Sequence, residues 1–139
     1  TPPPAWQAWL LRALSALFPT AKALDIDASA VSRDQAVVDA YVADPLVHHD
    51  NVPARTVVSL FDEASAVLGC ASQVSLPTLL LHGEEDQLTS VAASRQFIDE
   101  LSAADKQITV YPGMYHELFN EPEKDDIIRT CLDWIATRV

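Results

Sequence analysis

An aspartate and a histidine each follow a segment that has the pattern of a β-strand. Asp86 comes after the apolar run 78–81, and His116 comes after the alternating run 107–111. Because the carboxyl ends of neighbouring parallel strands meet at one edge of a sheet, we expect the two side chains to lie together. A carboxylate bonded to imidazole Nδ1 fixes the ring tautomer and leaves Nε2 free as a general base. The pair is predicted to be two-thirds of a nucleophilic triad, and the alternative is a solvated acid beside an ordinary loop histidine.

Two further stretches contain groups that could bind a metal ion. His82 shortly precedes three consecutive acids, residues 84–86, and a second stretch at 48–50 reads His-His-Asp. Consecutive acids point in different directions, and adjacent histidines rarely converge on one ion. His82 is better interpreted as a residue at the end of a strand. We therefore expect no metal site and no organic cofactor.

The second half of the chain has the predicted order strand, helix, strand, helix. One helix is expected over 90–101, and the last is expected to begin at Pro122, where acids gather near its positive end. The unbroken apolar run 78–81 is typical of a strand buried on both faces. Two parallel strands alone would leave a face and a ladder edge open. We expect residues outside this chain to complete the sheet, with a homo-oligomer as the alternative.

The first half is predicted to be wholly helical. Apolar spacing indicates a helix over 6–18, a capping box begins another at Ser32, and a third covers 55–68 with Gly69 as its stop. The stripe led by Trp6 and Trp9 is expected to pack over a core, with contact to lipid as the alternative. The predicted fold class is α/β, with a helical segment over 1–70 and a β-α-β-α segment over 71–139.

Composition excludes several classes of protein. The 139 residues have a net charge of −11, which repels nucleic acid, and 49% of them are hydrophobic, which is enough to form a core. No apolar run approaches the roughly 20 residues needed to cross a bilayer, and the chain opens Thr-Pro-Pro-Pro instead of with the basic residues of a signal peptide. The two cysteines, Cys70 and Cys131, have no metal-like spacing and are expected to pack in the core. We expect a cytoplasmic or peripherally membrane-associated protein.

The residues around the predicted pair resemble the end of an α/β-hydrolase. Residues 76–86 read LPTLLLHGEED, and residues 111–121 read YPGMYHELFNE. Further strings in the first half, at 24–27, 31–34 and 43–49, are similar to the cap of the monoacylglycerol lipases, so the resemblance covers nearly the whole chain. It implies that Asp86 is the triad acid, that His116 is the triad base, and that Tyr41 offers a hydroxyl to the glycerol part of the substrate.

The nucleophile that such enzymes need is missing from the sequence. It lies in a Gly-x-Ser-x-Gly turn, and the three glycines, Gly69, Gly83 and Gly113, are too widely spaced to form one. The resemblance therefore implies hydrolysis of monoacylglycerols to fatty acid and glycerol, with the reactive serine in an N-terminal half of the hydrolase, in the same protein or a separate chain. This chain alone is predicted to be inactive. The expected partners are the lipid ester substrate and the N-terminal half of the hydrolase. Peripheral contact with a lipid surface is also expected.

Two alternatives to this function stay open. The chain could be a catalytically inactive, hydrolase-like fragment that acts as a binding module. It could also belong to an esterase of another specificity, because one fold serves many chemistries.

Overall fold

The computed structural model describes residues 4–138, so most of the opening Thr-Pro-Pro-Pro stretch lies outside the described residues. The chain forms two compact units, each built from two pieces of sequence. One unit contains Thr1–Ile26 and His48–Cys70, and the other contains Asp27–Val47 and Ala71–Val139. The second unit thus contains residues 27–47 as well as residues 71–139, and the division into a cap over 1–70 and a core over 71–139 stays a prediction.

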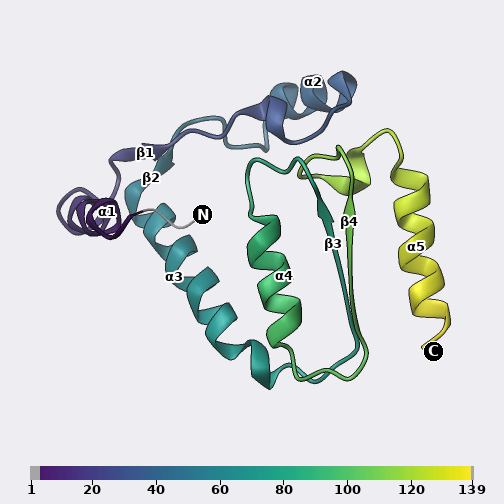
Figure 1. The fold of residues 1–139 in the computed structure, drawn as a ribbon. Helices are drawn as coiled ribbons and strands as arrows, with labels where there is room; N and C mark the ends of the chain where they lie inside the picture. The colour runs from purple at the N-terminus through teal and green to yellow at the C-terminus, as the bar shows by residue number, and fades with distance from the viewer. Residues whose placement is uncertain (1–3, 139) are drawn as a thin grey trace. The chain divides into compact units, whose positions relative to one another are not determined.

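The second unit is built around two parallel strands, β3 (Thr78–Gly83) and β4 (Lys106–Tyr111). They pair in unbroken register from Thr78 opposite Lys106 to Gly83 opposite Tyr111. Helix α4 (Val91–Glu100) connects them, and helix α5 (Lys124–Ala136) follows β4. The two helices lie on opposite sides of the strand pair (Figure 1). The predicted order of strand, helix, strand, helix is confirmed.

Each face of the strand pair has its own apolar cluster. Leu80 of β3 and Ile108 of β4 pack with Ile98 of α4, whereas Leu81 packs with Ile127 of α5 on the other face. Neighbouring strand residues point to opposite faces, which explains why the run of leucines is continuous. The first four residues of β3 are nevertheless only half-buried, and its last two are buried. The expected burial on both faces is thus reached only at the end that leads to Asp86, because the sheet has two strands in this chain.

The remaining elements of the second unit begin at different residues from those predicted. Helix α2 (Gln35–Ala43) is capped by Asp34, whose Oδ1 accepts a hydrogen bond from the Ala36 N–H at 2.9 Å, so the capping box at Ser32 is wrong. The Ser32 hydroxyl donates instead to the Asn120 carbonyl at 2.9 Å. Helix α5 begins at Lys124 because Pro122 lies in a turn. Three short 3₁₀ helices complete the unit: η1 (Ala28–Ala30), η2 (Ala71–Gln73) and η3 (Leu118–Asn120).

The first unit contains helices α1 (Ala5–Leu17) and α3 (Ala54–Cys70) and a small antiparallel pair, β1 (Lys22–Leu24) with β2 (Val52–Pro53). The prediction of a wholly helical first half is wrong at this pair, because strands of three and two residues are too short to show an alternating pattern. Helix α3 also continues through Gly69 to Cys70, so Gly69 is not its stop. Cys70 is exposed, so the expectation that it packs in the core is wrong, whereas Cys131 is half-buried.

The tryptophans of α1 are exposed in this chain. The side of α1 that is less exposed contains Ala8, Leu11 and Ser15, at helical spacing, whereas Trp6 is 63% and Trp9 is 67% exposed. The expectation that the tryptophan stripe packs over a core is therefore wrong within the described residues. Helix α1 is apolar on more than one face, and the sequence pattern does not say which face is covered. No helix in the described part of the chain is both long and apolar enough to cross a membrane.

Candidate active site

Asp86 lies in the loop after β3, where several donors hold its carboxylate. Its Oδ1 accepts from the N–H groups of Leu88 at 2.7 Å and Thr89 at 3.0 Å, and its Oδ2 accepts from the Thr89 hydroxyl at 2.6 Å. The side chain is only 3% exposed. This turn closes on itself within four residues, so residues 86–89 by themselves supply three hydrogen bonds to the carboxylate.

His116 lies in the loop after β4, and its Nδ1 is 2.8 Å from Asp86 Oδ2. The structure therefore brings together the two residues that the strand pattern predicted to meet. Burial by itself would raise the pKa of Asp86, but the hydrogen bonds from His116 and Thr89 outweigh it and lower that pKa to about 2. Asp86 is then ionised at neutral pH and can only accept, so the Nδ1 atom of His116 carries the proton.

The other ring nitrogen of His116 is available for chemistry. The side chain is 37% exposed, and among residues 4–138 no group forms a hydrogen bond to Nε2. With Nδ1–H donated to a carboxylate, the neutral ring has its lone pair on Nε2. This geometry suits a general base that takes a proton from a hydroxyl and then returns it to a leaving group.

Two glycines allow the loops after β3 and β4 to come close. A side chain at Gly83 would collide with the carbonyl oxygens of Met114 and Tyr115, and Gly113 has a φ of 71°, which favours glycine. The Glu85 N–H donates to the Met114 carbonyl at 2.9 Å across this contact. Gly83 is thus required because the backbone of the histidine loop passes directly over it.

Glu121 holds the other side of the loop that carries His116, a role that no sequence pattern indicated. Its side chain is completely buried and accepts hydrogen bonds from the Tyr115 N–H at 3.2 Å, the Arg33 N–H at 3.1 Å and Arg33 Nε at 2.5 Å. The Glu117 N–H also donates to the Val31 carbonyl at 2.8 Å. The segment before α2 is therefore tied to the loop that carries His116.

The other residues singled out in the sequence lie outside the Asp86–His116 pair. Tyr41 is half-buried in α2, in the same unit as the pair, and its contact with substrate stays a prediction. His48 and His49 are exposed, and the described residues contain no group of three or more histidine, cysteine or acidic side chains that could hold a metal ion. His82 is 8% exposed and contacts Asp86, which the sequence did not indicate.

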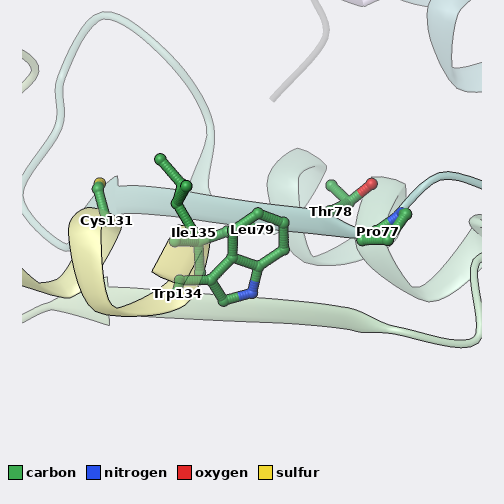
Figure 2. Close-up of a pocket in the computed structure, with 6 residues that line it drawn as sticks. All are labelled: Pro77, Thr78, Leu79, Cys131, Trp134 and Ile135. Atoms are coloured by element: carbon green, nitrogen blue, oxygen red, sulfur yellow. The ribbon is translucent and has the colours of Figure 1, made fainter. Parts of the chain in front are cut away.

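A hollow also lies between β3 and α5, at the end of the strand away from Asp86. It is lined by Pro77, Thr78, Leu79, Cys131, Trp134 and Ile135 (Figure 2). The lining is mostly apolar, and the Asp86–His116 pair is not part of it. The hollow thus adds no reactive group to the candidate site.

Parallel strands followed by an acid and a histidine, with a helix on each side, define the C-terminal part of an α/β-hydrolase. The comparison with protein families gives the same class. A family described as serine aminopeptidase, S33, matches residues 1–123, and the chain belongs to this family.

Individual relatives include monoacylglycerol lipases. The chain is 39% identical over 128 residues to a monoacylglycerol lipase of Mycolicibacterium smegmatis. This match covers 92% of this chain and 46% of that protein. The crystal structure of the Paleococcus ferrophilus monoacylglycerol lipase matches with a TM-score of 0.85 and 30% identity, over 99% of this chain and 54% of that one.

A third similarity concerns the fold alone. The monoglyceride lipase of Saccharomyces cerevisiae, solved as a soluble variant with a substrate analogue, matches with a TM-score of 0.80 at 17% identity, over 97% of this chain and 50% of that one. The chain spans about half the length of the proteins in these three comparisons.

Proposed function

We propose that this chain supplies the acid, the base and the cap of a serine-type ester hydrolase that acts on monoacylglycerols. The observation that carries the proposal is the hydrogen bond from His116 Nδ1 to the buried, ionised carboxylate of Asp86. The similarity to monoacylglycerol lipases supports the choice of substrate. The nucleophilic serine is proposed to lie outside these 139 residues, because no Gly-x-Ser-x-Gly turn occurs among them.

Each residue of the pair has a defined part in the proposed reaction. His116 Nε2 takes the proton of the serine hydroxyl as its oxygen attacks the ester carbonyl, and the same proton then goes to the departing glycerol oxygen. Water, activated by His116, cleaves the acyl-serine bond and releases the fatty acid. Asp86 stays ionised throughout, and it holds the ring and stabilises the positive charge that His116 carries between the transfers.

The first experiment is fluorophosphonate labelling of the natively purified protein, followed by peptide mapping of the labelled serine. We expect one serine outside this chain to react, and we expect the same sample to release fatty acid and glycerol from a monoacylglycerol. His116→Ala should reduce both reactions at least about a thousandfold. His48→Ala, which changes an exposed histidine outside the pair, serves as the control and should leave both rates unchanged.

Three results would contradict the proposal in different ways. Absence of any labelled serine would favour a catalytically inactive binding module. Cleavage of a simple methyl ester in preference to the monoacylglycerol would indicate an esterase of another specificity. Cleavage of an aminoacyl amide would indicate a peptidase, the activity that the family description names.

We also propose that Tyr41 contacts the glycerol part of the substrate. This assignment rests on the resemblance of the first half to the cap of monoacylglycerol lipases. Tyr41→Phe removes only the hydroxyl, so KM for a monoacylglycerol should rise severalfold, whereas KM for a methyl ester of the same acid should not change. Equal changes for the two substrates would contradict this role.

The exposed side of α1 is proposed to touch lipid surfaces. Trp6, Trp9 and Leu10 are each at least half exposed, and exposed tryptophan is favourable at a lipid interface. The net charge of −11 favours zwitterionic over anionic vesicles. Trp9→Ala should weaken binding to phosphatidylcholine vesicles in a flotation assay, whereas Ala16→Ser, an exposed change on the same helix, should not.

A further inference from the structure

A second, buried histidine on strand β3 contacts the carboxylate of Asp86. His82 lies in β3, its side chain is 8% exposed, and its Nε2 is 3.2 Å from the Oδ2 atom that also binds His116. The Nδ1 atom of His82 is 2.8 Å from the hydroxyl of Ser94, on helix α4. A continuous chain of contacts thus runs from Ser94 through His82 and Asp86 to His116.

The charge of Asp86 determines how the protons are arranged along this chain. An ionised carboxylate only accepts, so the favourable arrangement places a proton on His82 Nε2. In the neutral ring Nδ1 then carries a lone pair, and it accepts the hydrogen bond from the Ser94 hydroxyl. The opposite tautomer would direct a nitrogen lone pair at the carboxylate. Thr89 Oγ1 lies 3.4 Å from the same Nε2 and can accept its hydrogen bond, because the Thr89 hydroxyl donates its own proton to Asp86 Oδ2.

We propose that His82 is a positioning residue that aims the Asp86 carboxylate at His116, and that Ser94 fixes the tautomer of His82. The inference rests on the proposed function, since it assigns a purpose to the orientation of the triad acid. His82 holds Oδ2 from the buried side, and His116 binds the same atom from the exposed side. Rotation of the carboxylate away from His116 would also break the contact with His82, so this contact and the hydrogen bond from His116 hold the same oxygen atom in place.

The first test needs no enzymatic activity. Long-range ¹H–¹⁵N correlation spectra of the ¹⁵N-labelled protein at neutral pH report which nitrogen of each histidine carries a proton. We expect His82 to have a proton on Nε2, and Ser94→Ala should increase the fraction with the proton on Nδ1 alone. A wild-type His82 with its proton on Nδ1 alone overturns the proposal.

The second test separates positioning from simple filling of space. His82→Leu keeps an apolar volume but removes the donor, whereas His82→Gln keeps an N–H that can reach Asp86. We expect His82→Leu to lose the downfield Nδ1–H proton resonance of His116 and His82→Gln to keep it. A purely structural role predicts that the Leu variant keeps this resonance or that both variants lose it, and either result overturns the proposal.

The kinetic readout uses the native protein that contains this chain and the reactive serine. His82→Leu should lower kcat about tenfold with KM unchanged, and His82→Gln should recover most of the loss. A kcat for His82→Leu equal to that of wild type overturns the proposal. If the wild-type protein itself neither reacts with fluorophosphonate nor hydrolyses esters, the proposed function fails, while the spectra still decide whether His82 orients Asp86.

Discussion

Glu121→Ala should destabilise the second unit by about 3 kcal/mol. The substitution removes a completely buried carboxylate that accepts from Tyr115 N–H, Arg33 N–H and Arg33 Nε. Two backbone N–H groups lose their partner, at a cost of about 1 kcal/mol or more each. The Arg33 guanidinium also loses a partner, but it is 31% exposed and keeps Glu123, so this loss adds only about 1 kcal/mol.

The matched control is Glu123→Ala, because Glu123 is the other carboxylate that binds Arg33. Its side chain is 45% exposed, so its loss should cost at most about 1 kcal/mol. Urea unfolding of the three proteins gives the two differences. Hydrogen exchange should also show the Tyr115 amide losing roughly hundredfold protection in Glu121→Ala only. Equal urea midpoints for the two variants, or an unchanged Tyr115 amide, would refute the argument.

Four other substitutions test the site and the core. Asp86→Asn should reduce the loss of stability at acid pH. The pKa of Asp86 is lowered to about 2, so its contribution to the free energy of unfolding is present above about pH 4 and is lost as the pH falls toward 2. Urea midpoints at pH 5 and pH 2.5 measure this, and an equal acid loss in the variant would contradict it. Gly83→Ala should cost about 1–3 kcal/mol in thermal unfolding because its methyl group meets the Met114 carbonyl, whereas Gly69→Ala, in open space on α3, should stabilise by about 0.5–1 kcal/mol. The same sign for both glycines would be a failure of the prediction. Ile127→Ala should cost about 2–5 kcal/mol because the side chain is fully buried, and a loss below 1 kcal/mol would show that the α5 face is not a core.

The strands and the Asp86–His116 contact could be predicted because their signals are local. An unbroken apolar run indicates a covered strand, and parallel strands bring their carboxyl ends to one edge. The hydrogen bond between Asp86 and His116 follows from these two rules and from the position of each residue in the short loop after its strand. The catalytic role of the pair needs a nucleophilic serine, which we propose lies outside these residues, and the role stays a prediction.

Long-range partners explain most of what the sequence did not indicate. Glu121 reads as one more acid in an acidic stretch, and its partner Arg33 lies 88 positions earlier. Ser32 fits a capping box, but its hydroxyl donates to the Asn120 carbonyl, also 88 positions away, and accepts from the Asp34 N–H, and Asp34 caps α2 instead. The contact of His82 with Asp86 depends on how the loop after β3 turns back, which spacing alone does not determine.

The bond between Arg33 and Glu121 bears on how chimeras of such hydrolases should be cut. A graft of residues 1–70 from a relative would replace Arg33 but keep the native Glu121, so the two halves of a buried ion pair would come from different parents. A graft limited to residues 1–26 and 48–70 exchanges one compact unit and leaves this pair intact. A chimera is therefore best joined at three places: between residues 26 and 27, between residues 47 and 48, and after residue 70.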